Sequence, residues 1–559
     1  MEYLTLEQKL TVKQKEALDL AQYYFRYAAT SQVNKAYRKK AIEDYGFYDG
    51  TGQWDKSQLH KLSANGYPPE VLNIVKPIIN SLTGVDVQTR FRVAFRSSSG
   101  NVKDDRLAKA ITHLGYHIQE NQDMTHKATQ KFMDMLITGI GWSNLFKQPS
   151  TSEIIYEHVH PLDVLFDPDD LSSQLNNSEF VIRIRWISLA EMKRLWPKHS
   201  SYFDSRFSVV KNVREAKEWK QYQGEVSPEI QQRAEIELDT FYLGEGYGRR
   251  VRVIEVQYRQ EMMSFEGMDI NGHYFATFNE KEALSLVEKM TDLERKSSKA
   301  IMRVLFTEDR LLEYAPLKPN VPDLPDFTYI PCLWSRRYSD GVPDGWLSSM
   351  KPVQRRYNSL QTRLSYLLSS TRAIYDEGAF SNKEPHEIEA MLSDPGAAIE
   401  ISPGSRFELH ANNQISGGYF TLLEKTVEDI QRVSGYYDEA LGKETNAQSG
   451  VAIRARQVNS VRGQTIAFDN LKLMKKREAR MMLNLIQSGS GAFLESQILT
   501  EDEKREIVIL NCVHDVDGKR VVVNDIRTLP LSIHIEEVPD FESPTQEQQA
   551  RLDRVPRAS

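Results

Sequence analysis

The sequence has few of the features that mark secreted, membrane-spanning or strongly basic proteins. Its 559 residues include only two cysteines, Cys332 and Cys512, which is typical of a reducing compartment and gives no disulfide framework. No apolar run approaches the roughly 20 residues that cross a bilayer, and the charged, amphipathic start has no signal-peptide pattern. The formal net charge is −7, whereas a protein that grips duplex DNA by its phosphates normally carries a basic surface. We therefore expect a globular protein with no membrane partner, and any DNA contact confined to a small surface.

Recognisable catalytic motifs are also missing. Gly442 and Lys443 look like the end of a phosphate-binding loop, but the first glycine of that motif is replaced by Tyr437, and Glu444 stands where a hydroxyl should bind Mg²⁺. The preceding segment has helical spacing and not the buried strand that such a loop follows. We interpret this stretch as a connection between helices, without bound nucleotide.

One histidine pair remains as candidate chemistry. His158 and His160 would face the same way on a strand, so a metal pair is geometrically possible. The aspartates that follow, in "DPDD" at 167–170, equally supply turn and capping hydrogen bonds. The turn interpretation is favoured, because no third histidine or cysteine lies nearby in the sequence.

The patterns that are present predict a helix-rich α+β protein. The length suggests three or four compact units. Helical periodicity covers about 5–43, 103–137 and 451–487, and alternating strands fill much of 142–262.

The middle of the chain shows a further change of pattern. Asn279 and Glu282 form an N-cap pair that predicts a helix over 279–299. A proline-rich stretch over 300–346 is typical of a small irregular α/β insertion. A second helix is then predicted from about Pro352 to Ser370.

Several segments, taken in order, resemble the portal (head-to-tail connector) proteins of tailed bacteriophages, especially the short-tailed type. The resemblance covers about residues 20 to 545. No single segment is specific, and their order carries the resemblance. The segments include "VKPIINSLTGVDVQTRFR", "MDMLITGIGW", "VHPLDVLFDP", "RVRVIEVQYR", "DGVPDGWLSSMKPVQRRYNSLQTRLS" and "SGVAIRARQ".

The resemblance implies a portal fold with wing, stem helices, clip and crown, assembled as a ring that usually has twelve copies. It implies a non-enzymatic virion protein at one capsid vertex, present in the host cytoplasm during assembly, with no cofactor and no metal. The implied partners are double-stranded DNA without sequence specificity, the terminase large subunit, a head-tail adaptor, and the major capsid and scaffolding proteins. The expected boundaries are 1–278 wing, 279–299 first stem helix, 300–346 clip, 347–372 second stem helix, 373–488 wing continuation with a long helix, and 489–559 crown or C-terminal region.

Two sets of candidate residues follow from this placement. Cations of the second stem helix are expected to face DNA in the channel; the alternative is that they pair with acidic residues of a neighbouring subunit. This set is Lys351, Arg355, Arg356 and Arg363. Aromatic residues of the clip are expected to dock the adaptor or terminase; the alternative is packing within their own domain. This set is Tyr329, Trp334, Tyr338 and Trp346.

Two other functions remain open as alternatives. One is a different neck or tail adaptor. The other is a metal- or phosphate-dependent enzyme that uses His158, His160 and the nearby aspartates.

Overall fold

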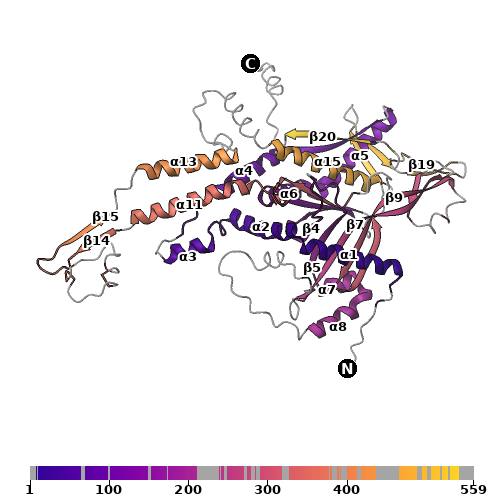
Figure 1. Ribbon diagram of the computed structural model, residues 1–559. Helices are drawn as coiled ribbons and strands as arrows, with labels where there is room; N and C mark the ends of the chain where they lie inside the picture. The colour runs from indigo at the N-terminus through magenta and orange to yellow at the C-terminus, as the bar shows by residue number, and fades with distance from the viewer. Residues whose placement is uncertain are drawn as a thin grey trace, which may run out of the picture.

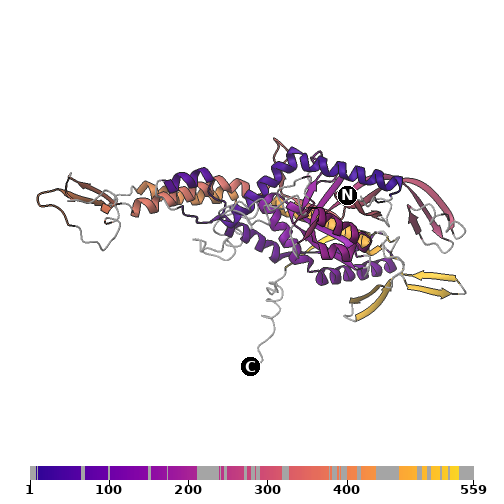
Figure 2. The ribbon, with the colours of Figure 1, turned by 90° about the horizontal axis from the view of Figure 1, so that it is seen from below.

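The computed structural model describes most of residues 8–539. The undescribed positions lie mainly within 1–7, 65–68, 149–152, 211–237, 244–248, 270–273, 279–289, 318–325, 381–399, 412–416, 436–464, 488–493, 500–504 and 540–559. The chain forms a body of sheets and helices from which one long helical arm projects (Figures 1 and 2).

The N-terminal part is helical. Its helices are α1 (Val12–Thr30), α2 (Gln32–Asp49), α3 (Lys56–Ala64), α4 (Val75–Gln88), α5 (Val102–Asn121) and α6 (Met124–Thr138). Thr11 and Gln14 form a reciprocal capping box that begins α1. Gly139, at a φ of 99°, ends α6 in the left-handed conformation that suits glycine.

The largest sheet has seven strands and lies against α1. Its main path runs β10–β9–β7–β5–β4, with β6 and β8 also paired to β7. The strands are β4 (Val164–Phe166), β5 (Phe180–Ser188), β6 (Tyr242–Leu243), β7 (Arg250–Asp269), β8 (Tyr274–Thr277), β9 (Met290–Thr307) and β10 (Arg310–Leu317). Apolar residues of α1, such as Leu18 and Phe25, share one buried cluster with Ile254 and Phe306 of this sheet.

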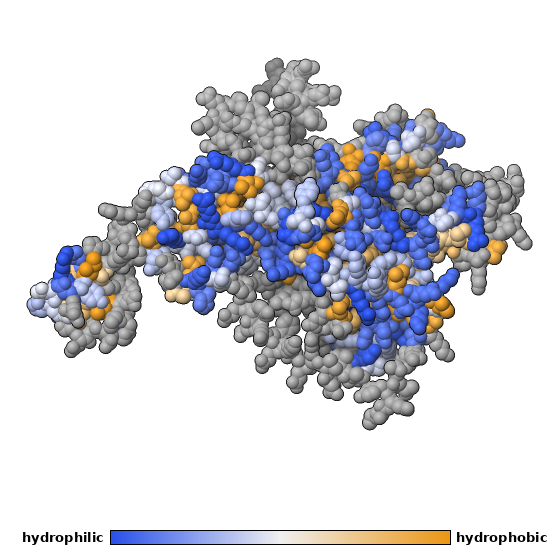
Figure 3. Space-filling view, viewed as in Figure 1, coloured by the Kyte–Doolittle hydropathy of each residue, from blue (hydrophilic) through white to orange (hydrophobic). Residues whose placement is uncertain are grey.

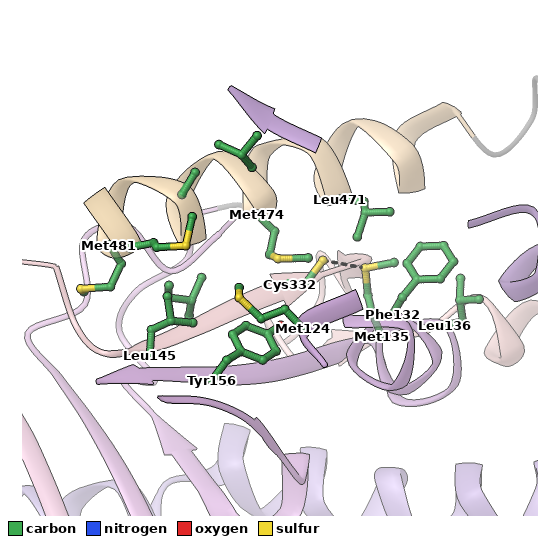
Figure 4. Close-up of a cluster of buried hydrophobic side chains, with 14 of the residues drawn as sticks. Met124, Phe132, Met135, Leu136, Leu145, Tyr156, Cys332, Leu471, Met474 and Met481 are labelled. Carbon is green, nitrogen blue, oxygen red and sulfur yellow. Dashed lines mark hydrogen bonds between the residues drawn. The ribbon is translucent and has the colours of Figure 1, made fainter. Parts of the chain in front are cut away.

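A second sheet forms the core that supports the arm. It has the order β11–β2–β3, with β2 (Ile140–Lys147), β3 (Ile154–Val159) and β11 (Tyr329–Leu333). Helix α15 (Thr465–Gln487) packs on this sheet and places Leu471 and Met474 opposite Met135 and Cys332 (Figure 4). Because α6 and α15 come from distant parts of the sequence, this cluster joins the two halves of the body.

Smaller elements complete the body. β1 (Thr89–Ser97) pairs with β20 (Leu531–Pro539), so the C-terminal part returns to the N-terminal helices. The other pairs are β12 (Ser335–Arg336) with β13 (Pro343–Asp344), β16 (Leu494–Leu499) with β17 (Arg505–Leu510), and β18 (Cys512–Val516) with β19 (Lys519–Val523). The short helices are η1 (Pro161–Asp163), α7 (Leu189–Leu195), η2 (Pro197–His199) and α8 (Ser200–Val210). Among the helices of the described residues, none combines the length and apolarity needed to cross a bilayer.

The arm consists of two helices and a hairpin. Helix α11 (Leu347–Ser369) leads outward, β14 (Thr371–Tyr375) and β15 (Phe407–Ala411) pair at the tip, and α13 (Gly417–Ser434) returns beside α11. Figure 1 shows this pair extending from the body, with the hairpin at its far end.

The structure corrects two predicted segments. The helix predicted over 279–299 is wrong from Met290 onward, because β9 begins there and pairs with β7 along nearly its whole length. The stretch 300–346 is not an insertion between two projecting helices. It supplies the end of β9 and all of β10 to the large sheet, and β11 to the second sheet. An N-cap pair is a local signal, and the backbone hydrogen bonds with β7 decide the conformation from Met290 onward.

Other predictions agree with the structure or fall partly outside it. The helix predicted from about Pro352 to Ser370 is confirmed as α11. The helix predicted over 103–137 is two helices, α5 and α6, which meet where Asp123 adopts a left-handed φ of 48°. Of the helix predicted over 451–487, α15 confirms Thr465–Gln487, and 451–464 lie outside the described residues together with the Gly442–Lys443 stretch.

Candidate functional site

The arm is the most distinctive surface that the chain offers to a partner. The sequence of α11 carries four cations and no carboxylate, and its apolar residues include the buried Tyr357 and Leu364. These two lie seven positions apart, so they share one face of the helix. At the base of the arm, Trp346 Nε1 donates a hydrogen bond to the backbone oxygen of Ser434 (3.2 Å) and ties the start of α11 to the end of α13.

Two of the four predicted DNA-facing cations are engaged with carboxylates of the body. Lys351 forms an ion pair with Asp44, whose side chain is fully buried, and is itself only 14% exposed. Arg355 lies 3.3 Å from Asp55, just before α3. Both residues therefore attach the base of the arm to the N-terminal helices.

The other two cations lie on an exposed face of α11. Arg356 is 4.0 Å from Asp429 of α13, and its side chain is 53% exposed. Arg363 is exposed and has no ion pair with any residue that the structure describes. Of the four, Arg356 and Arg363 are the ones available to an external partner.

The predicted docking aromatics are mostly buried. Tyr329 and Trp346 belong to the core, and Trp334 packs against Trp346 with ring centroids 6.1 Å apart. Burial raises the pKa of Tyr329 well above its usual range. Only Tyr338 is fully exposed. In the single chain, Tyr329 and Trp346 have almost no surface for docking and Trp334 is partly exposed, and docking through Trp334 or Tyr338 stays a prediction.

A row of polar side chains on α11 binds an extended segment, residues 69–74, which we call the strap. The backbone N–H groups of Glu70, Leu72 and Ile74 donate to side-chain oxygens of α11 at 3.0, 3.4 and 3.1 Å. The acceptors are Thr362 Oγ1, Asn358 Oδ1 and Gln354 Oε1, in that order. Sequence reasoning missed these residues. Their four-residue spacing was the available signal, because it predicts a polar stripe along one helix face.

The body contains two buried charged groups, one of them at the base of the arm. Asp44 accepts a hydrogen bond from Lys40 at 2.7 Å and forms an ion pair with Lys351, and Lys40 also lies 2.9 Å from Asp344. In the second group, Glu478 Oε1 of α15 accepts from Lys131 (3.1 Å), Ser143 (2.6 Å) and Tyr156 (2.8 Å). Burial lowers the pKa of Lys131, and the adjacent Glu478 opposes that shift.

The two histidines are hydrogen-bonded to different groups of the chain. His158 Nε2 lies 2.7 Å from Asp134 Oδ2, whereas His160 Nδ1 accepts from the backbone N–H of Leu162. Across the described ranges, no group of three or more histidine, cysteine or acidic side chains is placed to hold a metal ion.

The acidic run after the histidines is a hydrogen-bonded turn, as its sequence predicted. Asp167 Oδ1 accepts from the backbone N–H of Asp169 (3.1 Å), and Asp170 Oδ1 accepts from that of Ser172 (2.9 Å). The aspartates line an open pocket of about 620 Å³ against the tyrosines of α1. Two of these carboxylates are thus already used by the turn itself.

The comparison with known proteins gave one family. A family model described as Phage P22-like portal protein matches residues 24–555 of the chain. No curated protein matches it. The matched range contains the whole arm, the polar row on α11 and both buried charged groups.

Proposed function

The chain belongs to the Phage P22-like portal protein family, and on that premise we propose how its body and arm work in the virion. Proteins of this family are structural, non-enzymatic components of the phage capsid. We propose that copies of the chain form a ring, of twelve subunits as the family resemblance suggests, around a channel. Double-stranded DNA enters the head through this channel during packaging and leaves through it during ejection.

The observation that carries this proposal is the projecting arm. The antiparallel pair α11 and α13 serves as the stem, and the segment between them, including β14 and β15, serves as the clip (Figure 1). This assignment moves the clip from 300–346 to about 370–416. The remainder of the body, including β9 to β11, belongs to the wing.

The tip of the arm suits docking of the terminase and, later, the head-tail adaptor. Ala379, Phe380 and Ile388 form a small buried cluster there, separate from the cores of the body. Ile374 and Tyr375 on β14 remain 56% and 40% exposed. The small buried cluster gives the tip a packed core of its own, and its exposed apolar and aromatic residues are of the kinds found at the centres of protein interfaces.

Arg356 and Arg363 are proposed to face the channel. In a ring they would repeat once per subunit, giving sparse positive belts in a particle whose chains each carry −7. Each phosphate that a protein neutralises adds a salt-dependent contribution to its affinity for DNA. A few belts would therefore centre the duplex without holding it, and would do so for any sequence.

Ring formation is the first test. Electron microscopy and mass photometry of the purified chain should show closed particles with a central hole. A species that stays monomeric at high concentration would contradict the proposal.

A charge variant tests the channel assignment. Arg356→Gln with Arg363→Gln should leave rings intact but lower the yield of DNA-filled heads when the variant complements a portal-deficient phage. The control is Arg194→Gln with Lys198→Gln, which removes two exposed cations from the body. Loss of rings in the first variant would show that its arginines are interface residues and not channel residues.

The tip is tested by replacing residues 371–411 with a short glycine-serine linker. Rings should persist, because the wing cores do not include this segment, and binding of the purified terminase large subunit should be lost. Unchanged binding would remove the docking role from the tip.

A further inference from the structure

The arm has two flanks of different composition, and both are fixed to the same helix. One flank is α13, which is tied to the base of α11 by the Trp346–Ser434 hydrogen bond. The other is the strap with α3, which lies alongside the arm in Figures 1 and 2. Each flank leaves one surface directed away from α11.

The strap is held in register along α11. Alternate backbone N–H groups of an extended chain point to the same side and repeat about every 6.6–6.8 Å, while four residues of helix rise about 6 Å. The pairs 70 with 362, 72 with 358 and 74 with 354 follow this near match, so the strap runs antiparallel to the helix. Gln354 Nε2 also donates to the backbone oxygen of Leu72 at 2.7 Å.

This fixation presents a surface that we call the strap edge: Leu72, His60 and Lys61. Leu72 is 53% exposed, although its backbone N–H and its backbone oxygen are both bound to α11. His60 and Lys61 are exposed on α3, and residues 56–64 contain no carboxylate. An exposed apolar side chain accompanied by basic ones suits a partner surface that is apolar and acidic.

The outer surface of α13 has the complementary composition. Its inward face buries Thr426, Ile430 and Ser434. Phe420 and Glu424 follow one another at four-residue spacing on an exposed face, and we call them the α13 stripe. The next residue at this spacing, Glu428, is already paired with Arg432 of the same helix at 3.3 Å. Phe420 is 48% exposed. Figure 3 shows apolar and hydrophilic residues interleaved along the projecting helices.

We infer that, in the ring, the α13 stripe of one subunit packs on the strap edge of the next. This inference rests on the proposed function, since it names the surfaces that close the ring at the level of the stem. Two different, complementary surfaces on one chain form a head-to-tail contact, which is the kind that generates rings. Phe420 would cover Leu72, and Glu424 would face His60 and Lys61. Arg356 and Arg363 take no part in this contact and stay available to the channel.

Cross-linking tests the pairing directly. The variant Leu72→Cys with Phe420→Cys should, under mild oxidation, give a ladder of covalent multimers beyond the dimer on a non-reducing gel. Both substitutions are made in a chain whose native Cys332 and Cys512 are replaced by serine, so each single variant can give at most dimers. The control is Phe420→Cys with Val102→Cys, because Val102 is exposed on α5, away from the arm. A ladder no stronger than that of the control would overturn the inference.

Charge reversal gives a second, independent readout. Glu424→Lys should raise the protein concentration needed for rings by roughly tenfold or more, because like charges would then meet across the contact. Adding Lys61→Glu to the same chain should restore assembly. Unchanged assembly of the first variant would contradict the pairing. If the unaltered chain forms no rings at all, the proposed function fails instead, so the two failures are distinguishable.

Discussion

Lys351, near the start of α11, forms an ion pair with Asp44 of α2, whose side chain is completely buried. Lys40 approaches the same carboxylate at 2.7 Å. Lys351 and Lys40 therefore share one buried carboxylate at the base of the arm. This arrangement gives Lys351 a role in anchoring the arm, in place of the DNA contact that its sequence position suggested.

Removing the charge of Asp44 should destabilise the folded chain. Asp44→Asn is expected to lower the free energy of unfolding in urea by about 3–5 kcal/mol, because it leaves buried positive charge uncompensated. Asp49→Asn is the matched control: its pair with Lys76 spans 3.5 Å between exposed side chains and should contribute about 0–1 kcal/mol. Equal losses in the two variants would contradict the anchoring role.

Gly141 should tolerate no larger side chain. A Cβ at this position of β2 would lie 2.1 Å from the backbone oxygen of Lys131. Gly141→Ala is therefore expected to cost at least about 1–3 kcal/mol through forced backbone movement. Gly84→Ala serves as control, because a Cβ there has no heavy atom within 4 Å and alanine favours a helix by about 1 kcal/mol. Calorimetric melting should show opposite shifts for the two variants.

The Lys131–Glu478 group should behave as a unit. Glu478→Leu leaves three buried donors without their shared acceptor, and a loss of about 3–5 kcal/mol is expected. Lys131→Met in the same chain should recover part of that loss, since no unpaired charge then remains. A double-mutant cycle by urea denaturation measures the coupling, and simple additivity would argue against it.

The contribution of the hydrogen bonds between the strap and α11 can be measured on the unassembled chain. Asn358 is buried, accepts from the backbone N–H of Leu72 and donates to Gln53 Oε1 at 2.7 Å. Asn358→Ala should cost about 1–3 kcal/mol and speed amide hydrogen exchange in residues 70–74. The adjacent exposed Ser359→Ala provides the control. Protection of the strap that is identical in both variants would mean that the hydrogen bond does not hold it.

Tyr202 should give a pH dependence at the alkaline end. Burial, followed by its hydrogen bond to Asp309 (2.6 Å), raises the pKa of Tyr202 from 10.0 to about 12. A raised pKa means that this contribution to stability is fully present below pH 10 and is lost as pH rises towards 12. The difference in free energy of unfolding between the unaltered chain and Tyr202→Phe should therefore be constant below pH 10 and shrink above it. A difference that stays flat up to pH 12 would show that the hydroxyl is not held in this way.

Local signals in the sequence predicted the elements that depend on local physics. The helix predicted from about Pro352 to Ser370 corresponds to α11, and the helix end predicted at 137 lies one residue before the end of α6. Alternation over 142–262 predicted strands where β5 and most of β7 lie. These elements depend on backbone dihedral preferences and on the spacing of apolar residues. Both are set by residues that lie close together in the chain.

Long-range contacts decided the rest. The N-cap pair at 279 and 282 predicted a helix that would continue past Met290, yet the backbone from Met290 onward pairs with β7, and this pairing sets its conformation. Tyr329 and Trp346 had the composition of an interface, but packing against other elements buried them. The partner of α11 in the arm is α13, which follows it only after the tip hairpin. Asn358 and Leu72 lie 286 positions apart, and no periodicity of either segment specifies that they meet. Such contacts form because the folded chain must satisfy its buried hydrogen-bonding groups together, and that requirement acts on the whole structure and not on any one stretch of sequence.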